Sequence, residues 1–302
     1  MPILDGEGVS LNYTVAGEGA PVTLLHGFTL SGQSWREIVG KMPAGWSWLM
    51  PDLRGHGATR IAAGAPVTMD ACMRDLEMLW NHLGIERSHL VGYSMGGRLA
   101  LHVAVRLPER VRSLLTIGAH PGLEEEAARA GRREGDEGLA QRLDRFGLEP
   151  FINYWEAQPL FAGLERRGKP FAARVRAMRM SNRPEGLAAS LRQMGAGAME
   201  PLWGELDSIQ VPATFVAGEE DTAFVSAARR MSQAVHGSRV EIVPRSGHAV
   251  HMQRPAVFAR ILVAHLERDS SLTSSRVAGR PEALLVEHPA TGDGFEHELT
   301  DA

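Results

Sequence analysis

The stretch Gly92-Tyr93-Ser94-Met95-Gly96-Gly97 decides the fold of this 302-residue chain. It joins an apolar run at residues 89–93, which predicts a buried strand, to residues 95–106, which predict a helix. In a G-x-S-x-G turn between a strand and a helix, the serine is held in a strained conformation that projects its hydroxyl above the sheet. A side chain at either flanking glycine would clash there. The alternative interpretation is a glycine-rich turn in which Ser94 caps the helix.

Strands and helices alternate on both sides of this turn. Short apolar runs bounded by Gly, Pro or Asp are typical of buried strands in a parallel sheet. Such runs occupy residues 21–25, 46–50, 111–117, 213–217 and 240–243. Residues 9–15 alternate only in part and predict an edge strand. Helices are expected at residues 70–83, 225–235 and 255–266. The alternation predicts an α/β protein with a mostly parallel sheet flanked by helices.

Residues 120–200 interrupt this alternation. They lack strand-like runs and are rich in Arg, Glu and Ala, so we expect helices inserted between two strands as a lid over the carboxyl edge of the sheet. The core then comprises residues 1–119 and 201–268. Residues 269–302 are rich in Ser, Gly and Pro with scattered acids, which predicts a flexible C-terminal tail.

Composition argues against several classes of protein. A net charge of −4 from 32 basic and 36 acidic residues disfavours bulk nucleic acid or an anionic membrane surface as the main partner. The single cysteine, Cys72, excludes a disulfide framework and a cysteine-rich zinc site, and we expect it to be a small core residue. We see no signal peptide and no apolar run near the ~20 residues of a membrane-spanning helix. The expected location is therefore cytoplasmic, without membrane insertion.

A serine hydroxyl becomes an effective base or nucleophile only when a histidine accepts its proton. In chains with this type of turn, the order along the sequence is Ser, acid, His. Asp221 and His248 each follow a predicted strand, so both are expected on loops at the carboxyl edge of the sheet. The acid would orient the imidazole and stabilise its cation. Ser94, Asp221 and His248 are therefore the expected catalytic residues.

Other acids and histidines remain alternatives. His251 lies shortly beyond the expected base, and Glu219 and Glu220 directly precede the expected acid. Asp207 comes before its strand, so we expect it at the opposite edge of the sheet. His56 also follows a predicted strand, and we interpret it as a structural histidine that satisfies backbone groups of its loop.

A second glycine-containing turn follows the strand at residues 21–25. In His26-Gly27-Phe28, the turn can aim the backbone N–H of Phe28 at the same space as the N–H of Met95. Two such N–H groups form an oxyanion hole, which stabilises negative charge on a substrate oxygen. The alternative is a tight turn with the Phe28 side chain packed into the core, and both can hold together.

Five motifs in this order resemble the α/β-hydrolase superfamily. They are HGF at 26–28, PDLRGHG at 51–57, GYSMGG at 92–97, GEED at 218–221 and SGH at 246–248. The resemblance covers roughly residues 9–267 and implies an α/β-hydrolase fold with an inserted helical lid.

Within that superfamily, the chain most resembles the 2-succinyl-6-hydroxy-2,4-cyclohexadiene-1-carboxylate synthases of menaquinone biosynthesis, which are lyases. The segments that carry this resemblance are residues 90–100, 119–123 (AHPGL), 129–132 (RAGR), 155–161 (WEAQPLF) and 179–192, which start with RMSNRPEGL. Segments of the lid are more diagnostic than the serine turn, because many chemistries share the core.

The resemblance implies the same triad and a set of residues that bind the substrate. The arginines of this set would bind the substrate carboxylates. That set is Tyr93, Arg98, Arg132, Trp155 and Arg179. The choice of Arg132 over Arg129 or Arg133 stays open. The implied reaction eliminates pyruvate from 2-succinyl-5-enolpyruvyl-6-hydroxy-3-cyclohexene-1-carboxylate, with no metal and no organic cofactor.

The implied substrate is a small polycarboxylate with three carboxylates, so its binding requires several cations. Arginine matches a carboxylate bidentately, and Arg98 lies one helical turn beyond Ser94 on the pocket side of the helix. Residues 165–183 carry seven basic side chains against one acid, Glu165. The alternative for each of these is a solvated helix face, and for Tyr93 and Trp155 it is packing.

Two other functions stay open on sequence alone. One is a serine hydrolase acting on an ester or a carbon–carbon bond of an acidic substrate, because the same triad would activate the serine. The other is a ligand-binding receptor that kept the fold, although the intact Ser, Asp and His set argues against it. The sequence gives no indication of the oligomeric state.

Overall fold

The computed structural model describes residues 2–270, and most of the segment expected to form a flexible tail lies outside these residues. Within them, one sheet of nine strands has the order β1-β2-β4-β3-β6-β7-β8-β9, with β5 paired to β2. The strands are β1 (Ile3–Gly6), β2 (Val9–Ala16), β3 (Gly19–Leu25), β4 (Gly45–Pro51), β5 (Arg60–Ile61), β6 (Ser88–Tyr93), β7 (Val111–Ile117), β8 (Ala213–Gly218) and β9 (Arg239–Val243).

The sheet is mostly parallel, as predicted. Strands β3, β4, β6, β7, β8 and β9 run parallel to one another, and β1 and β2 are antiparallel to their neighbours. The prediction of an edge strand at residues 9–15 is wrong, because β2 pairs with β1 on one side and β4 on the other. The edge is β1, whose four residues are too few to produce a recognisable pattern.

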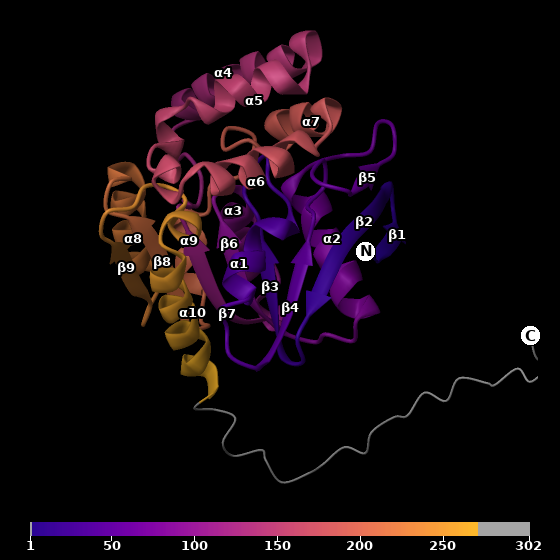
Figure 1. Cartoon of the computed structure of the whole chain (residues 1–302). Coiled ribbons are helices and arrows are strands. Elements are labelled where there is room, and N and C mark those ends of the chain that lie inside the picture. The colour runs from indigo at the N-terminus through magenta and orange to yellow at the C-terminus, as the bar shows by residue number, and fades with distance from the viewer. Residues whose placement is uncertain (1, 271–302) are drawn as a thin grey trace, which may run out of the picture.

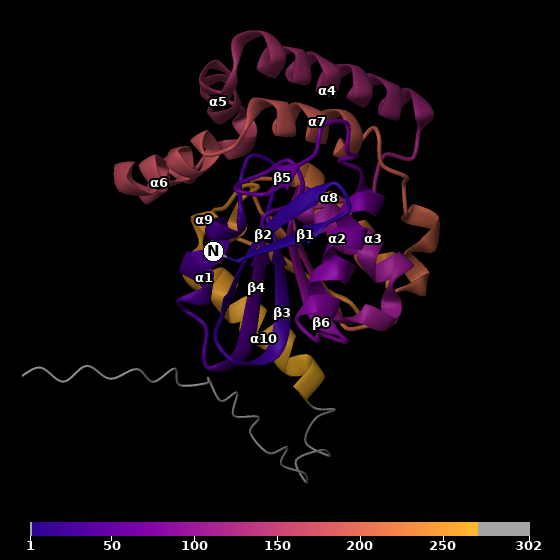
Figure 2. The same cartoon turned by 90° about the vertical axis from the view of Figure 1, so that its right-hand side faces the viewer.

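Helices cover both faces of the sheet (Figures 1 and 2). They are α1 (Arg36–Val39), α2 (Met69–His82), α3 (Met95–Arg106), α4 (Glu126–Phe146), α5 (Leu148–Glu156), α6 (Lys169–Met180), α7 (Pro184–Met194), α8 (Thr222–Ala234), α9 (Val250–Gln253) and α10 (Pro255–Ser270). One apolar cluster joins the sheet to α2, α3 and α8, and a second joins it to α1 and α10. Every residue of β6 is buried because helices cover both faces, which explains its continuous apolar run.

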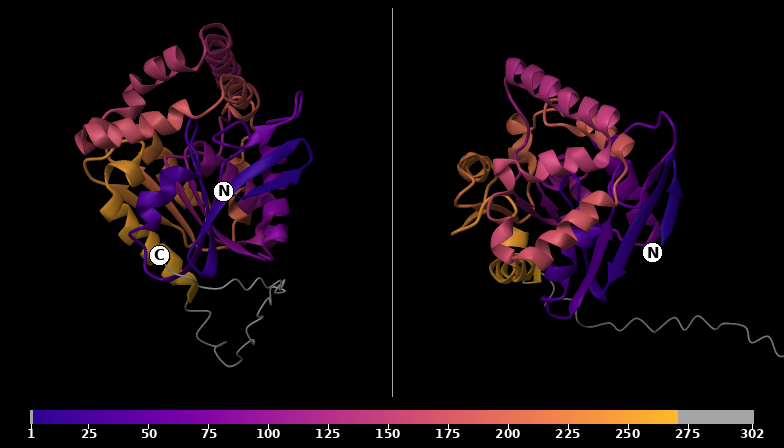
Figure 3. Two further views of the ribbon diagram at one scale, coloured as in Figure 1. Left: turned by 45° about the vertical axis from the view of Figure 1, so that its right-hand side comes forward. Right: turned by 45° about the horizontal axis from the view of Figure 1, so that its top comes forward.

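Helices α4 to α7 lie between β7 and β8 in the chain and above one edge of the sheet (Figure 3). They share a small apolar cluster that includes Leu143, Phe151 and Leu187. We call residues 120–200 the lid segment. Its helical character agrees with the sequence, whereas the division into a core and a separate lid remains a prediction.

Candidate active site

Ser94 occupies the turn between β6, in the middle of the sheet, and α3. Its φ of 51° lies in the left-handed region, which is strained for a residue with a side chain. A Cβ atom on Gly92 would collide with the carbonyl of Gly96, and one on Gly96 would collide with the carbonyl of Leu25. The two glycines thus allow the close backbone packing that presents the serine hydroxyl at the carboxyl edge.

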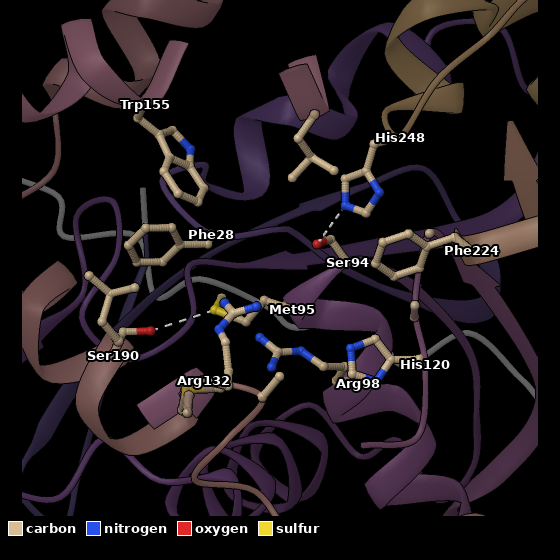
Figure 4. Close-up of a pocket in the computed structure, with 17 residues that line it drawn as sticks. Phe28, Ser94, Met95, Arg98, His120, Arg132, Trp155, Ser190, Phe224 and His248 are labelled. Carbon is tan, nitrogen blue, oxygen red and sulfur yellow. Dashed lines mark hydrogen bonds between the residues drawn. The ribbon is translucent and has the colours of Figure 1, made fainter. Parts of the chain in front are cut away.

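The three residues expected to form a triad come together at this edge. Figure 4 shows Ser94 and His248 facing each other. Asp221 follows β8 and precedes α8, and His248 lies on the loop after β9. The Nδ1 atom of His248 is 2.7 Å from Asp221 Oδ2, and its Nε2 atom is 2.9 Å from Ser94 Oγ. Since the carboxylate can only accept, Nδ1 carries a proton and Nε2 is available to accept the serine proton. The geometry therefore matches a Ser-His-Asp triad.

None of the three alternative acids occupies the position of Asp221 beside His248. Glu219 accepts a hydrogen bond from the backbone N–H of Arg245 at 3.1 Å, and Glu220 pairs with Arg166 at 2.8 Å. Asp207 belongs to a 3-10 turn, residues 203–208, that precedes β8.

The alternative base, His251, is buried between Trp35 and Tyr93, with ring-centroid distances of 4.6 and 4.5 Å. Neither of its ring nitrogens has a hydrogen-bond partner among the described residues, and burial lowers its pKa to about 3. His251 is therefore a neutral packing residue here.

The expected oxyanion hole has two free donors. The backbone N–H groups of Phe28 and Met95 have no hydrogen-bond acceptor within residues 2–270. The turn before Phe28 is held by His26, whose Nε2 accepts from the Leu53 N–H at 2.9 Å while Nδ1 donates to the Gly27 carbonyl at 2.9 Å. Burial lowers the pKa of His26 to about 4, which keeps the ring neutral for this double role.

The side chain of Phe28 also packs, so both interpretations of this turn hold. Its ring meets His56 edge-on at a centroid distance of 5.5 Å and Trp155 at 5.3 Å. His56 itself is buried and donates from Nδ1 to the Arg54 carbonyl at 3.0 Å, in keeping with the structural interpretation. Cys72 is buried in the core, as predicted.

A cavity of about 190 Å³ lies over Ser94, between the sheet edge and the lid segment (Figure 4). Its lining includes Phe28, Arg98, His120, Arg132, Trp155 and His248. A smaller cavity of about 20 Å³ also reaches Ser94, and Tyr93, Trp155 and Arg179 line it. All five residues expected to bind substrate thus line one or both cavities.

The three arginines differ in their counter-charges. The Nε of Arg132 lies 2.9 Å from both carboxylate oxygens of Asp136, and the Nη1 of Arg179 lies 3.1 Å from Glu156 Oε1. Half-buried Arg98 has no ion-pair partner within residues 2–270, and its Nη1 is 3.7 Å from the sulfur of Met199. Burial, together with the nearby charge of Arg132, lowers the pKa of Arg98 to about 10.

The three arginines of α4 among which the choice was open differ in their surroundings. Arg132 lines the larger cavity. Arg129 bonds to the carbonyl of Leu123 and to Glu126, and Arg133 bonds to the carbonyl of Gly197 and to Glu126. Both therefore hold the start of the lid segment together.

The cationic stretch at residues 165–183 is mostly a charged surface. Arg166 pairs with Glu220, and Arg167 pairs with Glu37 at 2.9 Å. Arg179 is different, because it is only 3% exposed and its guanidinium lies 4.6 Å from the centre of the Phe161 ring. The solvated-face alternative thus describes the exposed Arg166 pair, whereas the Arg167 pair is partly buried and Arg179 lines a cavity at Ser94.

Sequence reasoning missed His120 as a cavity residue. The Gly122 N–H donates to its Nδ1 at 3.1 Å, so the proton of the neutral ring is on Nε2. Burial and the charge of Arg98 lower its pKa to about 4, so it stays neutral near pH 7. His120 comes shortly after β7, and the reasoning applied to Asp221 and His248 would have found it. Phe224, which packs 4.6 Å from the His248 ring, gave no such signal.

None of the helices in residues 2–270 has the length and apolar character to cross a bilayer. The same residues contain no cluster of three or more His, Cys, Asp or Glu side chains arranged to hold a metal ion.

The fold and the triad geometry define an α/β-hydrolase-type enzyme, and the chain matches the alpha/beta hydrolase fold family over residues 20–255. A Bacillus subtilis protein that provisionally carries the name 2-succinyl-6-hydroxy-2,4-cyclohexadiene-1-carboxylate synthase is 37% identical over 257 residues, covering 83% of this chain and 93% of the relative. The Klebsiella pneumoniae synthase (strain MGH 78578) is 31% identical, covering 78% and 89%. The chain therefore belongs to the α/β-hydrolase superfamily and, within it, to the family of these synthases.

Solved structures agree with this assignment. MenH from S. aureus superposes with a TM-score of 0.81 at 29% identity, covering 85% of this chain and 98% of that one. A thermophilic esterase from Thermogutta terrifontis, with malate bound, has a TM-score of 0.76 at 27% identity, covering 86% and 94%. MenH and an esterase thus share this framework, so the framework alone does not define the reaction.

Proposed function

We propose that this enzyme eliminates pyruvate from 2-succinyl-5-enolpyruvyl-6-hydroxy-3-cyclohexene-1-carboxylate, giving 2-succinyl-6-hydroxy-2,4-cyclohexadiene-1-carboxylate. One observation supports this most directly. Arg98 is a half-buried cation without an ion-pair partner in the described part of the chain, and it lines the same cavity as Ser94. An uncompensated charge in a partly dry site is unfavourable, so an anionic guest is favoured there. An apolar ester would gain nothing from it.

The proposed chemistry starts at the triad. His248 accepts the proton of Ser94, and the serine oxygen removes the ring proton alpha to the succinyl ketone. The electron pair moves onto the ketone oxygen, and the N–H groups of Phe28 and Met95 stabilise the resulting enolate. Collapse of the enolate through the ring double bond breaks the C–O bond to the enolpyruvyl group. The leaving enolate takes up a proton and becomes pyruvate.

Substrate binding in this proposal uses both cavities. Arg98 and Arg132 line the larger one and would bind carboxylates there, while Arg179 lines the smaller one. Trp155 would line the substrate pocket in both cavities, and Tyr93 would line its smaller part. Each charge-assisted hydrogen bond of this kind contributes about 1.5–3 kcal/mol, and fixed carboxylates keep the leaving group aligned.

Side chains and backbone N–H groups perform every step, so the proposed mechanism invokes no metal and no organic cofactor. The proposed partner is a small polycarboxylate rather than nucleic acid, in line with the net charge of −4. The cytoplasmic location stays a prediction.

Pyruvate release from the authentic substrate tests this proposal. We expect the wild type to release pyruvate and Ser94→Ala to lose activity by about 10²–10⁴-fold, the usual contribution of general base catalysis. Undiminished release by the variant would contradict the role of Ser94.

Serine hydrolysis is the second candidate, and the malate-bound esterase among the similar structures favours it. Wild-type turnover of p-nitrophenyl acetate distinguishes the two functions. Brisk ester hydrolysis without pyruvate release would make the enzyme a hydrolase, whereas the lyase should show the reverse.

A further inference from the structure

We infer that Asn182, in the lid segment, is a positioning residue that holds both the oxyanion turn and Arg179. The N–H groups of the oxyanion hole belong to the core and Arg179 belongs to the lid segment. Contacts between the two segments must therefore fix their relative position. Asn182 lies just beyond the end of α6 and is only 5% exposed. The inference rests on the proposed function where activity is the measurement, but its central contacts are independent of the substrate.

The carboxamide of Asn182 joins three segments that are far apart in sequence. Its Oδ1 accepts from the Gly57 N–H at 2.8 Å, and its Nδ2 donates to the Thr29 carbonyl at 2.7 Å and to the Arg179 carbonyl at 2.9 Å. Gly57 lies on the loop after β4, and Thr29 on the turn after β3. A carboxamide, with one acceptor and two donors, can serve all three partners at once.

The bond to Thr29 acts on the oxyanion turn. Thr29 directly follows Phe28, and its φ of 66° is one of three positive φ values among the non-glycine residues that the structure describes. Such a conformation persists only where surrounding contacts enforce it. The Asn182 bond to the Thr29 carbonyl supplies one such contact, so losing it should let the turn relax and reorient the neighbouring Phe28 N–H.

The bond to Arg179 acts on the lid segment. Asn182 holds the Arg179 carbonyl at the last turn of α6, and the guanidinium of the same residue lines the smaller cavity at Ser94. The segment also rests directly on the core, because a Cβ on Gly55 would lie 2.5 Å from the Gly186 carbonyl oxygen. Figure 1 shows α6 and α7 above the strands of the core. A shift at Asn182 would therefore move both a donor and a cation of the site.

Two substitutions separate these contacts, and a third serves as control. Asn182→Asp keeps an acceptor for Gly57 but sets a carboxylate oxygen against two carbonyl oxygens, whereas Asn182→Ala removes all three bonds. Gln193 on α7 is the matched control, because its Oε1 accepts the Val67 N–H at 2.8 Å. It is also a bond between lid segment and core, but Gln193 lines neither cavity.

The first measurement is the rate at which a fluorophosphonate labels Ser94, followed by intact mass. The serine oxygen forms a bond to phosphorus, the P–F bond breaks, and His248 takes the proton. The phosphoryl oxygen requires the oxyanion hole but not the physiological substrate. We expect Asn182→Asp and Asn182→Ala to be labelled at least about tenfold more slowly than the wild type, and Gln193→Ala within about twofold.

The second measurement is steady-state pyruvate release, with melting temperatures recorded for every variant. The Asn182 variants should lose kcat by roughly 10–10²-fold, because an oxyanion donor acts in the transition state, while Gln193→Ala keeps its kcat despite a lower melting temperature. If Asn182→Asp does not fold, the kcat and labelling rate of Asn182→Ala alone test the inference.

Labelling of the Asn182 variants within about twofold of the wild type would overturn the inference. Equal slowing of Gln193→Ala would also overturn it, because the effect would then be general loosening of the lid segment. A wild type that is labelled but releases no pyruvate would instead refute the proposed function, and the labelling rates would still decide the role of Asn182.

Discussion

The two walls of the larger cavity are built in different ways. The core wall carries Ser94, His248 and the two N–H groups, each fixed by a turn at the end of a parallel strand. The opposite wall comes from the lid segment and includes Trp155, Leu191 and Arg132, which is held by Asp136. In the proposed mechanism, turns of the sheet position the groups that transfer protons, whereas the arginines expected to bind substrate come from both core helix α3 and the lid segment.

The arginines that line these cavities differ in whether they have a carboxylate partner. Arg132 and Arg179 come from the lid segment and each carries its own carboxylate partner, while Arg98 comes from core helix α3 and has none within residues 2–270. A cation that already has a counter-ion gains less from a bound carboxylate than one that lacks it. Substitutions should therefore have effects that decrease from the triad to Arg98, to Arg179, and to the paired surface arginines.

The largest effect on activity is expected for Asp221→Asn, which removes the carboxylate that orients His248 on the core side of the cavity. The amide would present an N–H group or a weaker acceptor to His248 Nδ1 in place of the carboxylate 2.7 Å away, and would favour the wrong tautomer. We predict a fall in kcat of about 10³–10⁴-fold with little change in KM. Rates of pyruvate release across substrate concentrations measure it, and a fall below about tenfold would remove Asp221 from the triad.

Arg98→Met should give the next largest effect, because it keeps side-chain volume but removes the unpaired charge. We predict an increase in KM of about 10–100-fold, equivalent to one charge-assisted bond, with a smaller change in kcat. Arg98→Lys keeps the charge without the planar guanidinium, so its KM should lie between those of Arg98→Met and the wild type. An unchanged KM in Arg98→Met would place the substrate carboxylates elsewhere.

The triad was predictable from sequence because parallel strands share one carboxyl edge. Residues that follow separate strands, such as Asp221 and His248, must then meet above the same turn. The partner of Arg132 follows from sequence spacing, because Asp136 lies four residues further along the same helix. Glu156 and Asn182 were not predictable, since they act through contacts that depend on how separate segments pack. The resemblance to a known family named Arg132 and Arg179, but the counter-ion of Arg179 and the Asn182 contacts became known only from the structure.

Arg179→Met tests the lid wall directly. Glu156 already compensates part of the Arg179 charge at 3.1 Å, and burial in turn lowers the pKa of this guanidinium. We predict an increase in KM of about 5–10-fold, smaller than for Arg98→Met, measured in the same pyruvate assay. The double variant with Glu156→Gln is the control for the carboxylate left behind. An effect larger than that of Arg98→Met would show that counter-ions do not set the order.

Arg166→Ala should have the smallest effect, although Arg166 belongs to the same cationic stretch as Arg179. Its side chain is 55% exposed and pairs with Glu220, which is 39% exposed. Such surface pairs contribute little to stability, and Arg166 lines neither cavity at Ser94. We predict kcat and KM within about twofold of the wild type and a nearly unchanged melting temperature. An increase in KM comparable to that of Arg179→Met would mean that the exposed charges of residues 165–183 attract the substrate, so that selection begins outside the cavity.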